Sequence, residues 1–96
     1  MHPRDAEGLE IDQHNESHLA GHNISATEVV QVWLGGPIYV PNARGLNGTW
    51  LMLGDTDGGR ALTVAVLADD VRRWLRPITG WDSTKGELTR WRQDGA

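Results

Sequence analysis

The chain has 96 residues, 39 % of them hydrophobic and five of them tryptophan, which suits one domain built around one core. It contains no cysteine, so a disulfide framework and thiol chemistry are excluded. Its net charge of −4 argues against a domain that embraces nucleic acid with its whole surface, and no apolar run is long enough to cross a bilayer. Because the first residues also lack the order of a signal peptide, we expect a cytoplasmic protein without a membrane partner.

The charges are unevenly distributed along the chain. From Arg60 onward there are seven cations against five anions, whereas the preceding residues carry eight anions and only two cations. Two interpretations stay open: a basic face on an acidic protein, or an ordinary mixed surface.

The first third of the chain contains a predicted tail and a predicted helix. Residues 1–8 are polar and aperiodic, so we expect a flexible tail ahead of a single domain that spans residues 9–96. Residues 9–12 alternate like a short entry strand. They lead into a helix over residues 13–21, whose first turn Asp12 can cap.

A second predicted helix is marked at both ends. Ser25 and Glu28 have the spacing of a capping box, in which each side chain bonds the backbone N–H of the other residue. Val29 and Val32 then continue an apolar face at helical spacing until Gly35 ends the helix.

Three predicted strands follow in meander order. Residues 49–53 and 61–67 are rich in β-forming residues, and the glycine-rich segment 54–59 between them suits a hairpin turn. A second turn leads into a strand over residues 71–79. Residues 38–40 are a further short strand candidate.

Pro77 interrupts the last of these strands, and a closing helix follows it. Because proline has no N–H to donate to a ladder, we expect Pro77 at an edge, at a bulge, or with its nitrogen pointing outward. Thr84 and Glu87 form another capping box and open a helix with Leu88 and Trp91 on one face. The expected fold class is α+β: two N-terminal helices, an antiparallel β-meander of three to four strands, and a C-terminal helix.

Several short motifs occur in the same order as these elements. They are His22-Asn23-Ile24-Ser25, Glu28-Val29, Leu53-Gly54, Gly59-Arg60-Ala61-Leu62-Thr63-Val64, Leu75-Arg76-Pro77-Ile78-Thr79, and the set Thr84, Glu87 and Trp91. As an ordered set that covers roughly residues 9 to 92, they resemble the BrnT-type toxin family.

This resemblance implies the fold of the small RelE-like ribonuclease toxins, an antiparallel sheet flanked by helices. It also implies a bacterial protein of a type II toxin–antitoxin system: a metal-independent RNA endonuclease that halts growth and needs no cofactor. Its expected partners are the RNA substrate and a ribbon-helix-helix antitoxin that masks the toxin. The assembly expected from the resemblance is a homodimer or a toxin–antitoxin hetero-oligomer.

The resemblance and the chemistry of RNA cleavage together point to a set of site residues. Cleavage needs a base for the 2′-hydroxyl proton, cations for the charge that develops on the phosphate, and an acid for the leaving oxygen. The catalytic candidates are His22, Arg60, Arg76 and Glu87, and the candidates for substrate binding are Lys85, Trp81 and Arg90.

Each of these residues also has a purely structural interpretation. Arg60 and Arg76 lie on strands expected to be neighbours, where they would clamp a phosphate from one face, but each also suits a solvated strand position. For His22 the alternative is a helix C-terminal cap, and for Glu87 it is the capping box. Trp81 stands in a Gly-Trp-Asp turn, where we expect it to be exposed.

Three histidines, His14, His18 and His22, recur at four-residue spacing and therefore share one helical face. A rise of ~1.5 Å per residue separates the outer two by about 12 Å along the axis, so one ion can bind only an adjacent pair. We expect no physiological metal site.

Two features depart from the BrnT pattern. Position 81 holds tryptophan where the family usually carries arginine, and the net charge is acidic. Both weaken RNA affinity, which depends on cations that neutralise phosphates. They favour an alternative function, in which a noncatalytic member of the same fold acts as a protein-binding or regulatory module.

The placement of the cations distinguishes the two functions. Cations gathered in one open groove favour the nuclease, whereas cations paired with carboxylates favour the binding module. The cations concerned are Arg60, Arg76 and Lys85, and the carboxylates considered as their partners are those of Asp69, Asp70 and Glu87.

Overall fold

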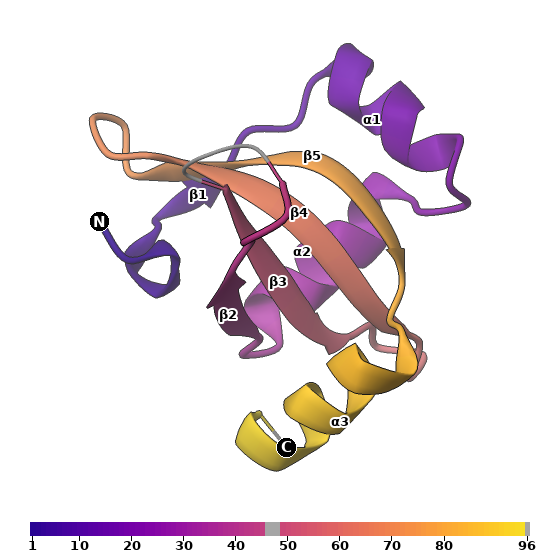
Figure 1. Cartoon of the computed structure of the whole chain (residues 1–96). Coiled ribbons are helices and arrows are strands. Elements are labelled where there is room, and N and C mark those ends of the chain that lie inside the picture. The colour runs from indigo at the N-terminus through magenta and orange to yellow at the C-terminus, as the bar shows by residue number, and fades with distance from the viewer. Residues whose placement is uncertain (46–48, 96) are drawn as a thin grey trace.

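The computed structural model describes residues 1–45 and 49–95, and within them it has three α-helices and a five-stranded mixed sheet (Figure 1). The α+β class expected from the sequence is confirmed. In chain order the elements are the 3-10 helix η1 (Pro3–Asp5), β1 (Gly8–Leu9), α1 (Gln13–Ala20), α2 (Ala26–Leu34), β2 (Ile38–Pro41), β3 (Thr49–Asp55), β4 (Ala61–Asp69), β5 (Trp74–Asp82) and α3 (Lys85–Asp94).

The strands follow the order β1-β5-β4-β3-β2 across the sheet. Strands β2 to β5 pair antiparallel with their neighbours in sequence, which is the expected meander. Strand β1 pairs with β5 in parallel and places Leu9 opposite Leu75. The entry strand expected over residues 9–12 is thus shorter and begins one residue earlier, and its parallel pairing with β5 was not predicted because local alternation does not reveal the partner strand.

The main core lies on the face of the sheet that α1 and α2 cover, and Figure 1 shows α2 behind the strands. Leu62, Val64 and Val66 alternate along β4 and point to this face, where Val29 and Val32 of α2 pack against them. All five side chains are at most 1 % exposed. The opposite face carries the intervening residues of the strands, and α3 lies at one end of it (Figure 1).

All three helices begin with a capping box. The caps predicted at Ser25 and Thr84 are confirmed, and Asp12 caps α1 through a reciprocal pair of hydrogen bonds with Asn15. These bonds satisfy N–H groups that have no partner within the helix. None of the helices within the described residues combines the length and the apolar composition that crossing a membrane requires.

Both limits of β5 differ from the expected strand. It begins at Trp74, and Val71 is 93 % exposed in the preceding turn. The turn extends to Arg73, because the Asp69 carboxylate accepts hydrogen bonds from the backbone N–H groups of Val71 and Arg72 (both 3.1 Å). The strand continues to Asp82, so the prediction that Trp81 lies in an exposed turn is wrong: it is a half-buried strand residue.

Pro77 lies at a bulge, which is one of the three positions predicted for it. The register shifts between Ala65 and Val66, whose partners are Thr79 and Pro77, so one residue of β5 is left without a partner on β4. The Pro77 carbonyl accepts a hydrogen bond from Nδ2 of Asn15 (3.0 Å) and thereby joins the strand to α1.

Residues 1–8, expected as a flexible tail, pack against the domain. Pro3 is buried in η1, and the ring of His2 lies 5.0 Å from that of Trp50. The amino group of Met1 forms an ion pair with Asp70 (3.2 Å). These contacts come from strands and turns far along the chain, so the polar composition of the segment did not reveal them.

Candidate functional site

Arg60 lies at the start of β4 and is tied to three chain segments. Its Nε donates to Oδ1 of Asp82 (2.7 Å), and its Nη1 donates to the carbonyl of Asn23 (2.7 Å) and to Oε2 of Glu28 (3.1 Å). The hydrogen bonds to Asp82 and then to Glu28 raise the pKa of the guanidinium further above its ordinary value. Arg60 therefore joins α2 to the end of β5 with its charge neutralised.

Arg76 is paired with a different set of carboxylates. Its Nη1 donates to Oδ2 of Asp12 (2.8 Å) and lies 3.4 Å from Oε1 of Glu10. The hydrogen bond from Arg76, together with that from the backbone N–H of Asn15, lowers the pKa of Asp12 to about 2. Arg76, on β5, thus binds the segment that immediately precedes α1.

The expectation that Arg60 and Arg76 converge on one phosphate is wrong. In the β4–β5 ladder Leu62 lies opposite Asp82, whereas Leu67 lies opposite Arg76. Seven residues separate Arg60 from Leu67, which is about 23 Å at a rise of ~3.3 Å per residue. The two arginines therefore lie at opposite ends of the same hairpin.

The ion pair between Asp12 and Arg76 predicts a pH-dependent contribution to stability. A carboxylate whose pKa is lowered in the folded chain stabilises it above its unfolded pKa, near 3.8, and loses this effect as the pH falls through about 2. Replacing Asp12 with asparagine keeps an N-cap oxygen and removes the charge. We expect the wild type to be more stable than Asp12→Asn at pH 6, and the difference to shrink between pH 5 and pH 2.

Urea denaturation of both chains at several pH values measures this difference. Asp57→Asn, which removes an exposed carboxylate from the turn before β4, is the matched control for the loss of a surface charge. A difference for Asp12→Asn that stays constant down to pH 2 would contradict the role assigned to the ion pair.

Glu87 occupies a different surface, at the start of α3. Its Oε1 accepts hydrogen bonds from Oγ1 of Thr63 (3.0 Å), from Nε1 of Trp81 (3.0 Å) and from the backbone N–H of Thr84 (2.8 Å). Partial burial is the largest single influence and acts to raise the pKa of Glu87, but the hydrogen bonds from Thr84, Trp81 and Thr63 together outweigh it and lower that pKa. Glu87 is therefore an anion near neutral pH.

This carboxylate lies at one end of a groove on the sheet face opposite the main core, which we name the open-face groove. Its volume is about 460 Å³. Leu51, Ala65 and Thr79 face one another across β3, β4 and β5 and line its floor. The remaining lining residues are Asn42, Ala43, Arg44, Gly45, Trp81 and Glu87.

Besides Arg60 and Arg76, three more of the predicted site residues lie outside this groove. His22 is exposed in the turn after α1, next to Asn23, whose carbonyl Arg60 binds. Lys85 is exposed at the start of α3, and Arg90 forms an ion pair with Asp94 on the same helix. The predicted residues are thus distributed over separate surfaces, and only Trp81 and Glu87 share one.

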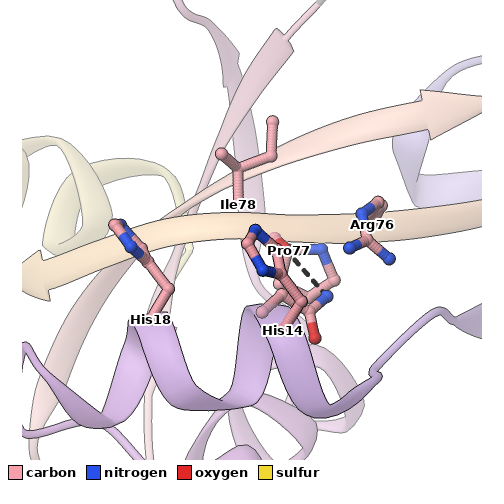
Figure 2. A pocket seen from close by; sticks show the side chains of 6 residues that line it. His14, His18, Arg76, Pro77 and Ile78 are labelled. Carbon is pink, nitrogen blue, oxygen red and sulfur yellow. Dashed lines mark hydrogen bonds between the residues drawn. The ribbon is translucent and has the colours of Figure 1, made fainter.

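A second cavity, of about 340 Å³, lies between α1 and β5 (Figure 2). Figure 2 shows the imidazoles of His14 and His18 rising from α1 toward the strand, with Arg76 further along it. The guanidinium of Arg76 is already paired with Asp12. Within the described residues no group of three His, Cys, Asp or Glu side chains is arranged to hold a metal ion.

The sequence did not identify the floor of the open-face groove. Thr63 and Ala65 alternate with the core valines of β4, so a signal was present: small and polar side chains on the face that the core does not use. This signal did not predict a groove, because small residues also occur on strand faces that another element of the fold covers.

Comparison with family models, curated proteins and solved structures finds no match for the chain. The resemblance to BrnT-type toxins therefore rests on the ordered motifs of the sequence. The function of the chain is therefore inferred from the open-face groove and from the ion pairs of Arg60 and Arg76.

Proposed function

We propose that the chain is a noncatalytic, protein-binding member of the RelE-like fold, related to BrnT-type toxins and acting in the cytoplasm, with the open-face groove as its binding surface. One observation carries this proposal. Arg60 and Arg76 are each paired with two carboxylates at opposite ends of the β4–β5 hairpin, so they do not form a common phosphate site.

The order of elements supports the fold assignment. Two helices precede an antiparallel meander and a third helix closes the chain, which is the arrangement that the BrnT resemblance implies. The partner class implied by the same resemblance is a ribbon-helix-helix antitoxin.

The electrostatics disfavour RNA as the ligand. A cation of the protein contributes to RNA affinity when it neutralises a phosphate and releases the counterion bound there. A cation that already pairs with two carboxylates must first break those ion pairs. The net charge of −4 adds a general repulsion of nucleic acid.

The open-face groove has the composition of a protein-binding surface. Leu51 and Ala65 provide apolar floor area, and Thr79 adds a polar group to the floor. Trp81 is a half-buried aromatic residue, and Glu87 lies at one end of the groove. Binding sites commonly combine apolar lining with few oriented polar groups. A partner side chain that enters this groove exchanges water for apolar contact.

A single substitution in the floor tests this function. Thr79→Arg fills the open-face groove with a long charged side chain, and we expect the immobilised chain to lose its captured protein partner at least ten-fold. Thr27→Arg makes the same change on the exposed side of α2, on the opposite face of the sheet, and is expected to retain the partner. Equal capture by both variants, with circular dichroism unchanged, would contradict the proposal.

Ribonuclease activity is the second candidate function, and one observation favours it. Glu87 is an anion beside Trp81 in an open groove, which is suitable for a base next to a stacking surface. Induced expression in bacteria tests this alternative with the wild type, Arg60→Ala and Arg76→Ala at matched soluble levels. Glu87→Gln is expressed alongside them, and we expect no growth arrest from any of the four chains; arrest by the wild type that Glu87→Gln abolishes would establish the nuclease instead.

A further inference from the structure

We propose that the open-face groove receives one basic side chain, an arginine or a lysine, from a segment of the partner protein, with Glu87 as its counterion. This inference rests on the proposed function and specifies the chemistry of the partner. It follows from the state of the Glu87 carboxylate, from the position of Trp81, and from the charge at the opposite wall.

The Glu87 carboxylate is held in a fixed orientation and has no counterion among the described residues. Oε1 accepts all three hydrogen bonds, from Thr63, Trp81 and Thr84. Glu87 is only half buried, and its carboxylate forms no ion pair with the described residues. An oriented carboxylate without an ion-pair partner suits a charge-assisted hydrogen bond from a guanidinium or an ammonium group.

Trp81 lies directly beside this carboxylate, because its indole N–H donates to it. An aromatic ring next to an anion is favourable for a cation, which can contact the ring and the carboxylate together. Leu51 and Ala65 continue the groove along the floor, where the aliphatic stem of an arginine or lysine can be buried while its charged end reaches Glu87.

Arg44 limits the partner to one basic residue at this position. It is exposed on the loop after β2, at the far wall of the groove, and forms no ion pair with the described residues. A second partner cation near it would be repelled, and a run of phosphates would meet Glu87 inside the groove. Charge complementarity therefore favours a single basic anchor over a polybasic segment or RNA.

A capped Ala-Arg-Ala tripeptide is the probe, and the indole N–H resonance of Trp81 is the readout, assigned with a Trp81→Phe variant. We expect a saturable shift with the wild type. The neutral isostere of the probe, with citrulline in place of arginine, is expected to bind at least ten-fold more weakly.

Glu87→Gln removes the charge and keeps the acceptor oxygen and the capping box, so the variant is expected to fold and to bind the arginine probe at least ten-fold more weakly. Glu16→Gln, an exposed carboxylate on α1, is the matched control and is expected to bind like the wild type. Equal binding by Glu87→Gln would overturn the inference, as would an RNA oligonucleotide that shifts the Trp81 signal at lower concentration than the peptide.

The failure of this inference can be distinguished from the failure of the proposed function. If Thr79→Arg abolishes partner capture while Glu87→Gln leaves both capture and probe binding intact, the groove binds a protein through other chemistry. If Thr79→Arg also retains the partner, the groove is not the binding surface.

Discussion

Replacing Asn15 with leucine is expected to lower the free energy of unfolding by about 3 kcal/mol, because each buried backbone group left without a partner costs roughly 1 to 3 kcal/mol. Asn15 is only 2 % exposed. Its Oδ1 accepts from the backbone N–H of Asp12 (2.8 Å), and its Nδ2 donates to the carbonyls of Glu10 (2.8 Å) and Pro77 (3.0 Å). Leucine fills the same space and satisfies none of the three.

Urea denaturation of the purified chains measures this effect. Ser17→Ala, at an exposed position of the same helix, is the control and is expected to change the free energy of unfolding by less than about 0.5 kcal/mol. Asn15→Asp keeps the acceptor for Asp12 and loses both donated bonds, so it separates the cap from the contact with β5. If Asn15→Leu lowered the free energy of unfolding no more than the control does, this would contradict the role of Asn15 in connecting α1 to β5.

Replacing Gly80 with alanine is expected to cost about 2 kcal/mol, since extra volume in a closely packed site typically costs 1 to 3 kcal/mol. A Cβ at this position would meet the Thr63 carbonyl oxygen and Cδ1 of Ile24, each at 3.1 Å. The backbone oxygen cannot move without disturbing the β4–β5 ladder, in which Gly80 pairs with Val64. Because Trp81 follows directly, we also expect its indole N–H resonance to shift.

Gly86→Ala is the matched control, because it makes the same change in the first turn of α3. A Cβ there would meet no atom within 4 Å. Alanine is a better helix former than glycine, so this variant is expected to be more stable than the wild type by roughly 0.5 to 1 kcal/mol. Thermal unfolding followed by circular dichroism distinguishes the two signs, and a stable Gly80→Ala chain would show that the contact with Thr63 relaxes freely.

The predicted site agrees with the structure only where short-range chemistry defines it. Glu87 was expected both as a capping residue and as a base, and its carboxylate does both cap α3 and face the open-face groove. Arg60 and Arg76 were expected to lie close together, yet each forms ion pairs with carboxylates from helices or loops distant in sequence, such as Glu28 and Asp12. The prediction that β4 and β5 are neighbours is confirmed, but the motifs did not indicate where along the hairpin each arginine lies.

The sequence by itself determined the local features: the starts of the helices at Asp12, Ser25 and Thr84, the meander, and the apolar face of α2 at Val29 and Val32. Each depends on residues within a few positions of one another, through capping hydrogen bonds and through side-chain periods of 2 and 3.6. The tertiary structure alone decided the ladder register with its bulge near Pro77, the partners of each arginine, and the groove beside Glu87. These depend on contacts between segments that are more than sixty residues apart, such as Asn15 with Pro77, whose energies no local pattern encodes.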